Sequence, residues 1–246
     1  MRTLRTHGLV AVAFVIVAAG CARQFPGPVR PRNEAQQAEG MTVLDDGTIS
    51  YILERLEISL RPMTDAELNR LFPQNSNSGA ESTNPYTYGN WTPLGESYTP
   101  QRFTVFQLRT KNYEFPKVRV NPDRAVLRTQ NRRTYESLDK LRLGEYYRSH
   151  AQAWAGNAFR RYRAAEETLR RTTYRGDMIF SGQEDEGFLV FEPLPTDVTS
   201  FTVTLEDVSL RFNYADEPVE TTQLTYEFER DIFSGYQPLE EALATQ

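Results

Sequence analysis

The sequence predicts a mainly β protein, built as an antiparallel β-sandwich with one long amphipathic helix inserted or packed beside it. Short apolar or alternating runs, separated by turn residues at intervals of about eight to twelve positions, predict the sandwich after Gly176. Apolar residues that recur every three or four positions over residues 145–173 predict the helix. An aromatic content of 12% is too high for a wholly disordered chain.

Residues 1–20 have the three parts of an export signal. Arg2 and Arg5 give a charged start, an apolar run covers residues 9–19, and small side chains come just before Cys21. As a helix, a run of about eleven residues reaches about 16 Å, roughly half the 30 Å thickness of a bilayer core. We therefore expect a signal peptide that is removed, and not a permanent membrane span.

This segment resembles a bacterial lipoprotein signal with its lipobox. The resemblance implies that Cys21 is the diacylated first residue of the mature chain and anchors it to a membrane. Ala22 follows the cysteine where Asp would favour the inner membrane, so the expected location is the outer membrane, facing the periplasm or the cell surface. Cys21 is also the only cysteine, which excludes an internal disulfide and a thiolate metal site.

Residues 21–40 are expected to form a flexible tether between the lipid and the folded part. Three prolines and few large apolar groups are typical of a linker. The sandwich domain is then expected over residues 41–236, with a C-terminal tail over residues 237–246.

The first elements of the domain are predicted to be a strand and a short helix. Apolar and polar residues alternate towards the end of the segment Ile49–Leu60, which is typical of a strand with one solvent-exposed face, and Pro62 is expected to end it. The segment Thr64–Glu67 has the pattern of a capping box, so a helix should follow and end at Pro73.

A long polar stretch over residues 73–100 is predicted to be a loop, and a loop of this length is either functional or mobile. Its aromatic side chains either pack onto the sheet or form an exposed surface on which a glycan or a partner could stack. These aromatic residues are Tyr86, Tyr88, Trp91 and Tyr98.

The remaining elements are strands before and after the helix. The apolar stripe of the helix contains Tyr147, Ala151, Trp154, Ala158, Tyr162, Ala165 and Leu169. A change of phase near Glu206 and Asp207 predicts a β-bulge in the longest strand. The predicted strands cover residues 103–110, 117–120, 124–129, 178–180, 188–191, 201–212 and 224–228.

The segment Gly182–Phe191, with Pro193 and the strand that ends at Phe212 after it, resembles part of the immunoglobulin-like sandwich domains of uncharacterised bacterial surface lipoproteins. The resemblance implies an immunoglobulin-like topology for the sandwich. It also implies a role in contacts within the cell envelope, since those domains have no established catalytic function.

The net charge of −5 conceals two segments of opposite charge. Residues 124–175 carry 13 basic and 5 acidic side chains, whereas residues 176–246 carry 2 basic and 16 acidic ones. The segments either neutralise each other in the fold or leave a basic face for an anionic glycan or a lipid headgroup. The candidate anionic-ligand face consists of Arg148, Arg160, Arg163, Arg170 and Arg171.

Common catalytic motifs are absent from the sequence. It has no Gly-x-Ser-x-Gly elbow, no glycine-rich phosphate loop before a helix and no His-Glu-x-x-His pair. The only histidines are His7, which leaves with the signal, and His150, which we expect to pack or to face solvent. A multi-histidine metal site is excluded, and we expect no cofactor.

Three functions remain, in this order. The first is a lipid-anchored, non-enzymatic scaffold or binding module that contacts another component of the cell envelope. The second is a binding module for anionic glycans or lipid headgroups, and the third is a hydrolase of an envelope polymer. Export to the envelope argues against nucleic acid as a partner, and the sequence leaves the oligomeric state open.

Overall fold

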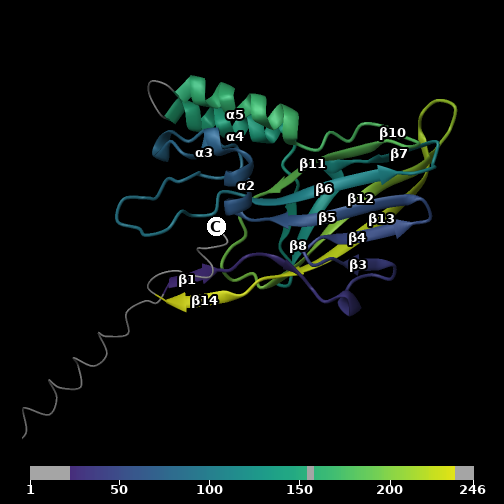
Figure 1. Cartoon of the computed structure of the whole chain (residues 1–246), viewed down its shortest axis with the longest axis horizontal. Coiled ribbons are helices and arrows are strands. Elements are labelled where there is room, and N and C mark those ends of the chain that lie inside the picture. The colour runs from purple at the N-terminus through teal and green to yellow at the C-terminus, as the bar shows by residue number, and fades with distance from the viewer. Residues whose placement is uncertain (1–22, 154–157, 236–246) are drawn as a thin grey trace, which may run out of the picture.

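A computed structural model describes residues 23–153 and 158–235 of this chain. The protein is mainly β, with two large antiparallel sheets, a small two-stranded sheet and a helical pair at one end (Figure 1). Cys21 and His7 lie outside the described residues, as does the predicted tail over residues 237–246.

The first large sheet has five strands in the order β11-β6-β5-β4-β3, and every neighbouring pair is antiparallel. Its strands are β3 (Met41–Val43), β4 (Ile49–Leu53), β5 (Leu56–Met63), β6 (Thr104–Asn112) and β11 (Glu184–Phe191).

The single strand predicted over Ile49–Leu60 is a hairpin of β4 and β5. The chain turns at Glu54, which has a positive φ of 52°. Pro62 does not end the second strand. Pro62 lies inside β5 and pairs with Phe106 of β6. The pairing of β5 with β4 ends at Leu60, which lies opposite Ile49. Because Pro62 comes after that point, the amide hydrogen that it lacks is not needed for pairing with β4.

The second large sheet follows the order β10-β7-β12-β13-β2, while β8 also pairs with β12 and β9 pairs with β8. The pairing of β12 with β13 skips from Leu205 to Val208, which confirms the predicted bulge at Glu206 and Asp207. Its strands are β2 (Arg30–Pro31), β7 (Lys117–Val120), β8 (Ala125–Thr129), β9 (Thr134–Glu136), β10 (Ile179–Phe180), β12 (Ser200–Phe212) and β13 (Pro218–Glu229).

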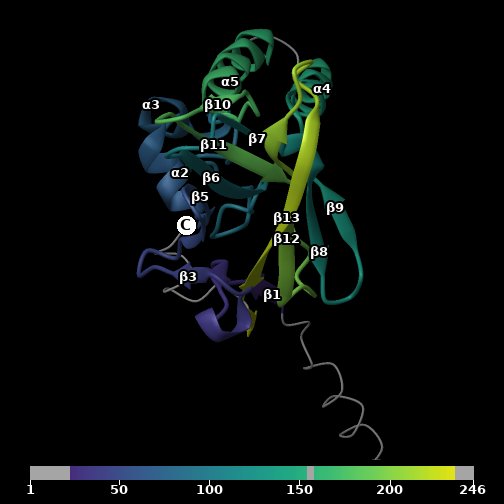
Figure 2. The same cartoon turned by 90° about the vertical axis from the view of Figure 1, so that its right-hand side faces the viewer.

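The two large sheets share one hydrophobic core, and Figure 2 shows them side by side. The ring of Phe106 in the first sheet lies 4.9 Å from that of Phe228 and 6.3 Å from that of Phe201, both in the second sheet. The buried hydroxyl of Tyr226 donates a hydrogen bond of 3.1 Å to the carbonyl of Ile58. Burial of these side chains is the main contribution that holds the sheets together.

Two helices replace the single long helix predicted over residues 145–173. They are α4 (Lys140–Ala153) and α5 (Ala158–Thr172), which pack against each other. Leu143 on α4 and Leu169 on α5 are buried in the same second core, together with Phe188 of β11. Both helices direct apolar residues towards one core. The three- and four-residue spacing of these apolar residues therefore continues across the break, and the sequence predicts one helix where there are two. Trp154 lies outside the described residues.

The predicted capping box begins helix α2 (Asp65–Leu71). The Thr64 hydroxyl accepts a hydrogen bond of 3.2 Å from the Glu67 amide, and the Glu67 carboxylate accepts one of 2.9 Å from the Thr64 amide. A short helix, α3 (Pro73–Ser76), follows directly, and two 3-10 turns, η3 (Gly79–Glu81) and η4 (Pro122–Arg124), lie in later loops.

We expect Thr64→Ala to lower the free energy of unfolding by about 1 kcal/mol, because the Glu67 amide at the start of α2 loses the hydroxyl that accepts its hydrogen bond. Urea unfolding followed by circular dichroism measures this change. Thr92 is exposed, so Thr92→Ala should change the free energy by less than about 0.5 kcal/mol and serves as the matched control. Equal effects of the two variants would contradict a stabilising cap.

The structure differs from the expected flexible tether from Arg23 onwards. Strand β1 (Arg23–Pro26) pairs with β14 (Ile232–Gly235), β2 pairs with β13, and a 3-10 turn, η2 (Glu34–Gln36), follows. Phe25 is 4% exposed and its ring lies 5.2 Å from that of Tyr98. The strand pairing and this single buried ring hold a segment whose composition is that of a linker.

Candidate functional site

Four arginines of the candidate anionic-ligand face lie on one exposed side of α5. Three of them pair with glutamates of the same helix: Arg163 with Glu166 at 3.4 Å, and Arg170 and Arg171 with Glu167 at 2.6 and 3.7 Å. Arg160, three residues before Arg163, is exposed on the same side. The fifth residue of the candidate face, Arg148, is exposed on the other helix, α4.

The acidic strands neutralise a different part of the basic segment. Arg124 and Arg128 both pair with Glu206 of β12, at 3.5 and 2.7 Å, and Arg175 lies 3.8 Å from Asp185 of β11. Among the described residues, no ion pair joins the arginines of α5 to these strands. Mutual neutralisation therefore applies to the residues before and after the helical pair, and not to the exposed side of α5.

A cleft of about 390 Å³ lies between the start of α4, the end of α5, strand β11 and the η4 turn. Arg170 lines this cleft together with Lys140 and Arg175, over an apolar floor that includes Phe188. Asp123 and Asp139 line it as well, so the cleft has mixed charge. It brings one residue of the candidate face, Arg170, to a concave surface.

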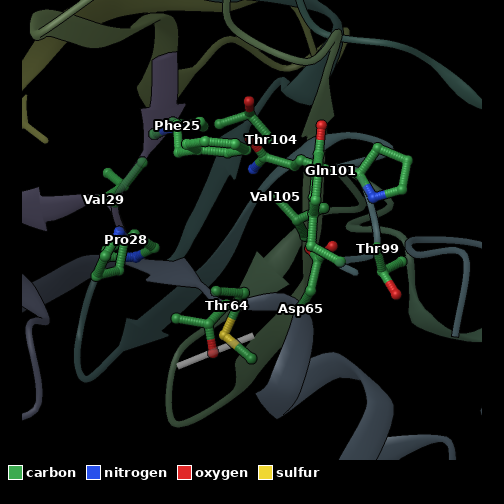
Figure 3. A pocket seen from close by; sticks show the side chains of 15 residues that line it. Phe25, Pro28, Val29, Thr64, Asp65, Thr99, Gln101, Thr104 and Val105 are labelled. Carbon is green, nitrogen blue, oxygen red and sulfur yellow. The ribbon is translucent and has the colours of Figure 1, made fainter. Parts of the chain in front are cut away.

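A second hollow, which we call the N-terminal cavity, lies between the segment 25–29, the start of α2 and the start of β6 (Figure 3). Its volume is about 80 Å³. Most of its walls are apolar or prolyl, and Asp65 and Thr104 are the polar side chains that matter for its chemistry. The residues that line it include Phe25, Pro28, Met63, Asp65, Tyr98 and Thr104.

Asp65 and Thr104 have unusual surroundings. Asp65 is the first residue of α2, and apolar walls raise the pKa of its carboxyl to about 7. Within the part of the chain that the structure describes, this carboxyl has no hydrogen bond or ion pair. Thr104 is 2% exposed, and its hydroxyl is buried without a hydrogen-bond partner. Asp65 itself is only partly buried, whereas the Thr104 hydroxyl has almost no accessible surface, so the two groups do not form one buried polar site.

Sequence reasoning missed both residues. An acidic residue in the first turn of a helix is common, because it interacts favourably with the helix dipole, so Asp65 carries no distinctive signal. Thr104 occupies an ordinary strand position. Both line the same cavity because the starts of α2 and β6 lie beside the N-terminal segment.

Of the four aromatic residues of the 73–100 loop, Tyr86 packs inward as the first of the two interpretations predicted, whereas Tyr88, Trp91 and Tyr98 are half-buried. Tyr86 is fully buried, and its hydroxyl lies 2.6 Å from that of Thr172 on α5. The guanidinium of Arg102 lies over the ring of Tyr147 at 4.5 Å and over that of Tyr88 at 4.9 Å. These contacts attach the loop to the helical pair.

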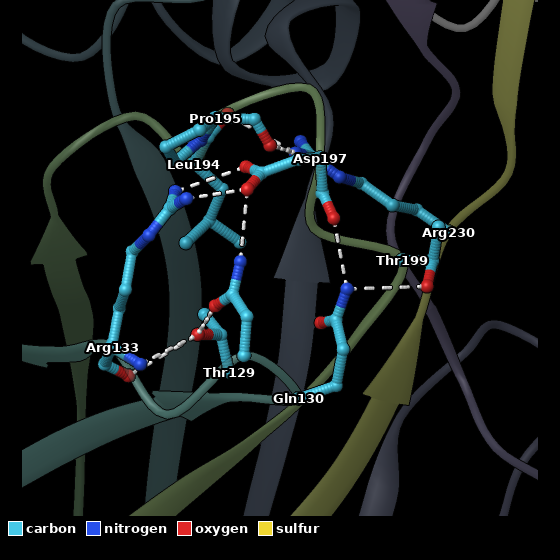
Figure 4. Close-up of polar contacts among 9 residues, drawn as sticks. Thr129, Gln130, Arg133, Leu194, Pro195, Asp197, Thr199 and Arg230 are labelled. Carbon is cyan, nitrogen blue, oxygen red and sulfur yellow. Dashed lines mark hydrogen bonds and ion pairs between the residues drawn. The ribbon is translucent and has the colours of Figure 1, made fainter.

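A polar network fixes the loop 194–199 at the opposite edge of the core (Figure 4). The buried guanidinium of Arg230 donates hydrogen bonds of 2.8 and 3.0 Å to the carbonyls of Val198 and Leu194, and a further one to that of Pro195. From the other side, Arg133 forms an ion pair with Asp197 through both of its terminal nitrogens. Every group is used within the fold, so we assign the network to stability.

A metal site and a membrane-spanning helix are two further features that the described residues could contain. The described residues contain no group of three or more His, Cys, Asp and Glu side chains that could hold a metal ion. Within residues 23–153 and 158–235, no helix is both long and apolar enough to cross a membrane.

The fold and its cavities define this chain as a mainly β protein with several antiparallel sheets and a small, mainly apolar hollow near its N-terminal strand. No family model matches the sequence, and no curated protein matches it. Among solved structures, the yjhA protein from Bacillus subtilis shows a weak similarity, with 8% identity and a TM-score of 0.31. The match covers 64% of this chain and 76% of that one.

Proposed function

We propose that this chain is a lipid-anchored protein of the cell envelope, a non-enzymatic binding module or scaffold that contacts another envelope component. The observation that supports the proposal most is the position of β1. The strand begins at Arg23, so only Ala22 separates it from Cys21, the proposed site of acylation. One residue spans about 3.5 Å at most, which would hold the folded part directly against the membrane surface.

The β1–β14 end of the molecule would then face the bilayer. Arg23 lies opposite Gly235 in the pairing, so both ends of the described chain lie at this side. A module held this closely is suited to a partner in the membrane or at its surface, while the cleft beside α4 and α5 stays accessible further away.

The immunoglobulin-like type of the sandwich is part of the proposal. Antiparallel pairing throughout both large sheets and their common core support it. The helical pair between β9 and β10 would be an insertion into that fold.

Replacement of Cys21 by Ser tests the anchor. We expect the wild-type protein to incorporate labelled palmitate and to sediment with membranes, and Cys21→Ser to lose both properties, because the thiol is the only site for the acyl group. Leu94→Ser, a change at a fully exposed residue, should leave both unchanged. A wild-type chain whose amino terminus is free of lipid in mass spectrometry would exclude the anchor. Affinity capture of the palmitate-labelled wild-type protein from its native membrane is the separate experiment that would identify the contacting component.

A second candidate function is the binding of an anionic glycan or lipid headgroup by α5. The four exposed arginines of α5 outnumber the two glutamates of the same helix, Glu166 and Glu167, so this side of the helix carries an excess of two positive charges. At about 1 kcal/mol for each excess charge near an anionic membrane, this surface would contribute roughly 30-fold in affinity at low salt.

Replacement of Arg160, Arg163, Arg170 and Arg171 by Gln tests this second candidate. We expect the fourfold variant to bind phosphatidylglycerol vesicles at least about 30-fold more weakly, as measured by cosedimentation at low salt. The matched control removes four other exposed arginines, Arg55, Arg109, Arg175 and Arg211, and so has the same net charge. An equal loss in both variants would contradict a specific role of α5.

A further inference from the structure

Strand β13 has an open edge over residues 221–225. One side of the strand pairs with β12, and on the other side the short strand β2 pairs only with Phe228 and Glu229. The side-chain amide of Gln37 takes the next place: it accepts a hydrogen bond of 2.9 Å from the Glu227 amide and donates one of 2.8 Å to the Glu227 carbonyl. Among the described residues, no strand pairs with this side of β13 before Phe228.

The backbone groups of this edge point outward at alternate residues. The amide and carbonyl of Glu227 face Gln37, and therefore point away from β12. Because successive residues of a strand direct these groups to opposite sides, those of Thr225, Gln223 and Thr221 also point away from β12. Thr221 and Gln223 are exposed and Thr225 is half-buried, so the groups are available to a further strand.

This edge lacks the features that usually protect such strands. Natural sheets cover their edge strands, keep them short, or place charged residues or proline on them. The other edge strands of the two large sheets follow this rule: β2, β3, β9 and β10 have two or three residues each, and β11 receives hydrogen bonds from the amides of Leu138 and Tyr174. The run Thr221–Thr225 is five residues long and contains no charged residue, proline or glycine.

We infer that this edge pairs with the same edge of a second copy of the chain. In an antiparallel pairing of identical strands, a two-fold axis relates the opposite residues. An axis at Gln223 places Thr221 of each copy opposite Thr225 of the other, and threonines form favourable cross-strand pairs. Glu220 then lies opposite Tyr226, so no like charges oppose each other along the paired edge.

The structure restricts the register of this pairing. An axis at a neighbouring residue would set outward-pointing groups against groups that already point towards β12. An axis at Thr225 would need the place at Glu227 that Gln37 occupies. An axis at Thr221 would extend the pairing past Glu220, where the regular register of β13 with β12 ends. Only an axis at Gln223 uses the open edge alone.

The pairing goes beyond the proposed function and does not need the anchor. Strand β13 runs from the hairpin tip at Pro218 to Glu229, and the chain then enters β14, which pairs with β1; Figure 1 shows the tip and β14 at opposite ends of the molecule. The two-fold axis reverses one strand relative to the other, so the two β1–β14 ends lie at opposite ends of the pair. Acylated copies, which rest on the proposed function, would therefore meet from two facing membranes.

Single cysteines test the pairing and its register. In the full chain with Cys21→Ser, in detergent micelles, no other thiol is present, and Gln223→Cys should form a disulfide-linked dimer on oxidation in air. Opposite residues of such a pair have Cα atoms about 5.5 Å apart, which a disulfide can bridge. Thr221→Cys is the matched control, because its two copies would lie about 13 Å apart along the strands. Linkage of Thr221→Cys alone, of both variants alike or of neither would overturn the inference.

Two further variants at residue 223 show whether the backbone makes the contact. Gln223→Pro removes the amide hydrogen on the axis without breaking a hydrogen bond to β12, so it should weaken dimerisation at least about tenfold in sedimentation equilibrium. Gln223→Ala keeps the amide and should weaken it less than about threefold. Equal dissociation constants of the two variants would contradict pairing through the backbone. If Gln223→Pro unfolds, the cysteine variants still decide.

Vesicles separate the pairing from the anchor. The acylated wild-type chain should cluster phosphatidylcholine vesicles, measured as an increase in light scattering, and Gln223→Pro should not. Clustering that persists in Gln223→Pro would overturn the role of this edge. Cross-linking at residue 223 without clustering would leave the pairing intact and overturn the arrangement across two membranes. Cross-linking at residue 223 in a protein whose native amino terminus is free of lipid would refute the anchor and leave the pairing intact.

Discussion

Arg230→Met is expected to lower the free energy of unfolding by about 3 kcal/mol, because three carbonyls, two of them in buried hydrogen bonds, lose their donor at once. Arg230 is 3% exposed, and its guanidinium donates hydrogen bonds to the carbonyls of Leu194 and Pro195 (Figure 4) and to that of Val198. Burial lowers the pKa of the guanidinium to about 10, which still leaves it charged at neutral pH. Each unsatisfied carbonyl costs about 1–3 kcal/mol, partly offset because no charge is buried any longer.

Urea unfolding of the variant at pH 7 measures this loss as a lower midpoint. Arg211→Met is the matched control, since the side chain of Arg211 is 72% exposed and only pairs with Glu220 at the surface. The control should change the free energy by less than about 0.5 kcal/mol. Arg230→Lys keeps the charge but cannot reach three carbonyls, so it should lie between the two. If Arg230→Met left the free energy of unfolding unchanged, water would have replaced the guanidinium as the donor to these carbonyls.

Phe106→Ala is expected to have the largest effect on stability, a loss of about 3–5 kcal/mol. Phe106 is fully buried at the point where the two large sheets meet, and its ring contacts those of Phe191, Phe201 and Phe228. Truncation removes the transfer free energy of the ring and leaves a cavity between two sheets that are fixed by their own hydrogen bonds.

Phe180→Ala is the control for this prediction, because Phe180 is 51% exposed on the edge strand β10. Its loss should remain below about 1 kcal/mol. In urea unfolding, the Phe106 variant should have a lower midpoint at an unchanged slope if the native and unfolded states stay the same. A loss of less than 1 kcal/mol would mean that the sheets do not share the core around Phe106.

Features that depend on neighbours in the sequence were predictable. The capping box at Thr64 and the bulge at Glu206 are both present, since each follows from residues within a few positions of one another. Strand β7 has the bounds Lys117–Val120 that its apolar alternation and flanking prolines indicated. The mainly β class follows from several such local patterns together.

Features that depend on where the chain reverses direction could not be predicted from the sequence. The turn at Glu54 is occupied by a residue without a strong turn preference, so the hairpin of β4 and β5 reads as one strand. The helical pair was predicted as one helix for a related reason. The three- and four-residue spacing of apolar residues indicates which face of a helix is buried, but it does not indicate where the chain reverses direction. Composition alone likewise gave no sign that residues 23–40 would be held by β13 and β14.

The sequence by itself determined the β-rich class, the local caps and bulges, and a lone cysteine that suits an acyl anchor, because each is written in short stretches of side chains. Tertiary structure decided which charges meet and which cavity forms. Asp65 and Thr104 come from α2 and β6, separated by the whole 73–100 loop, and they line one cavity beside the N-terminal strand, where packing closes the Thr104 hydroxyl off from water. Burial of a polar group is a property of the fold, and residue order cannot express it.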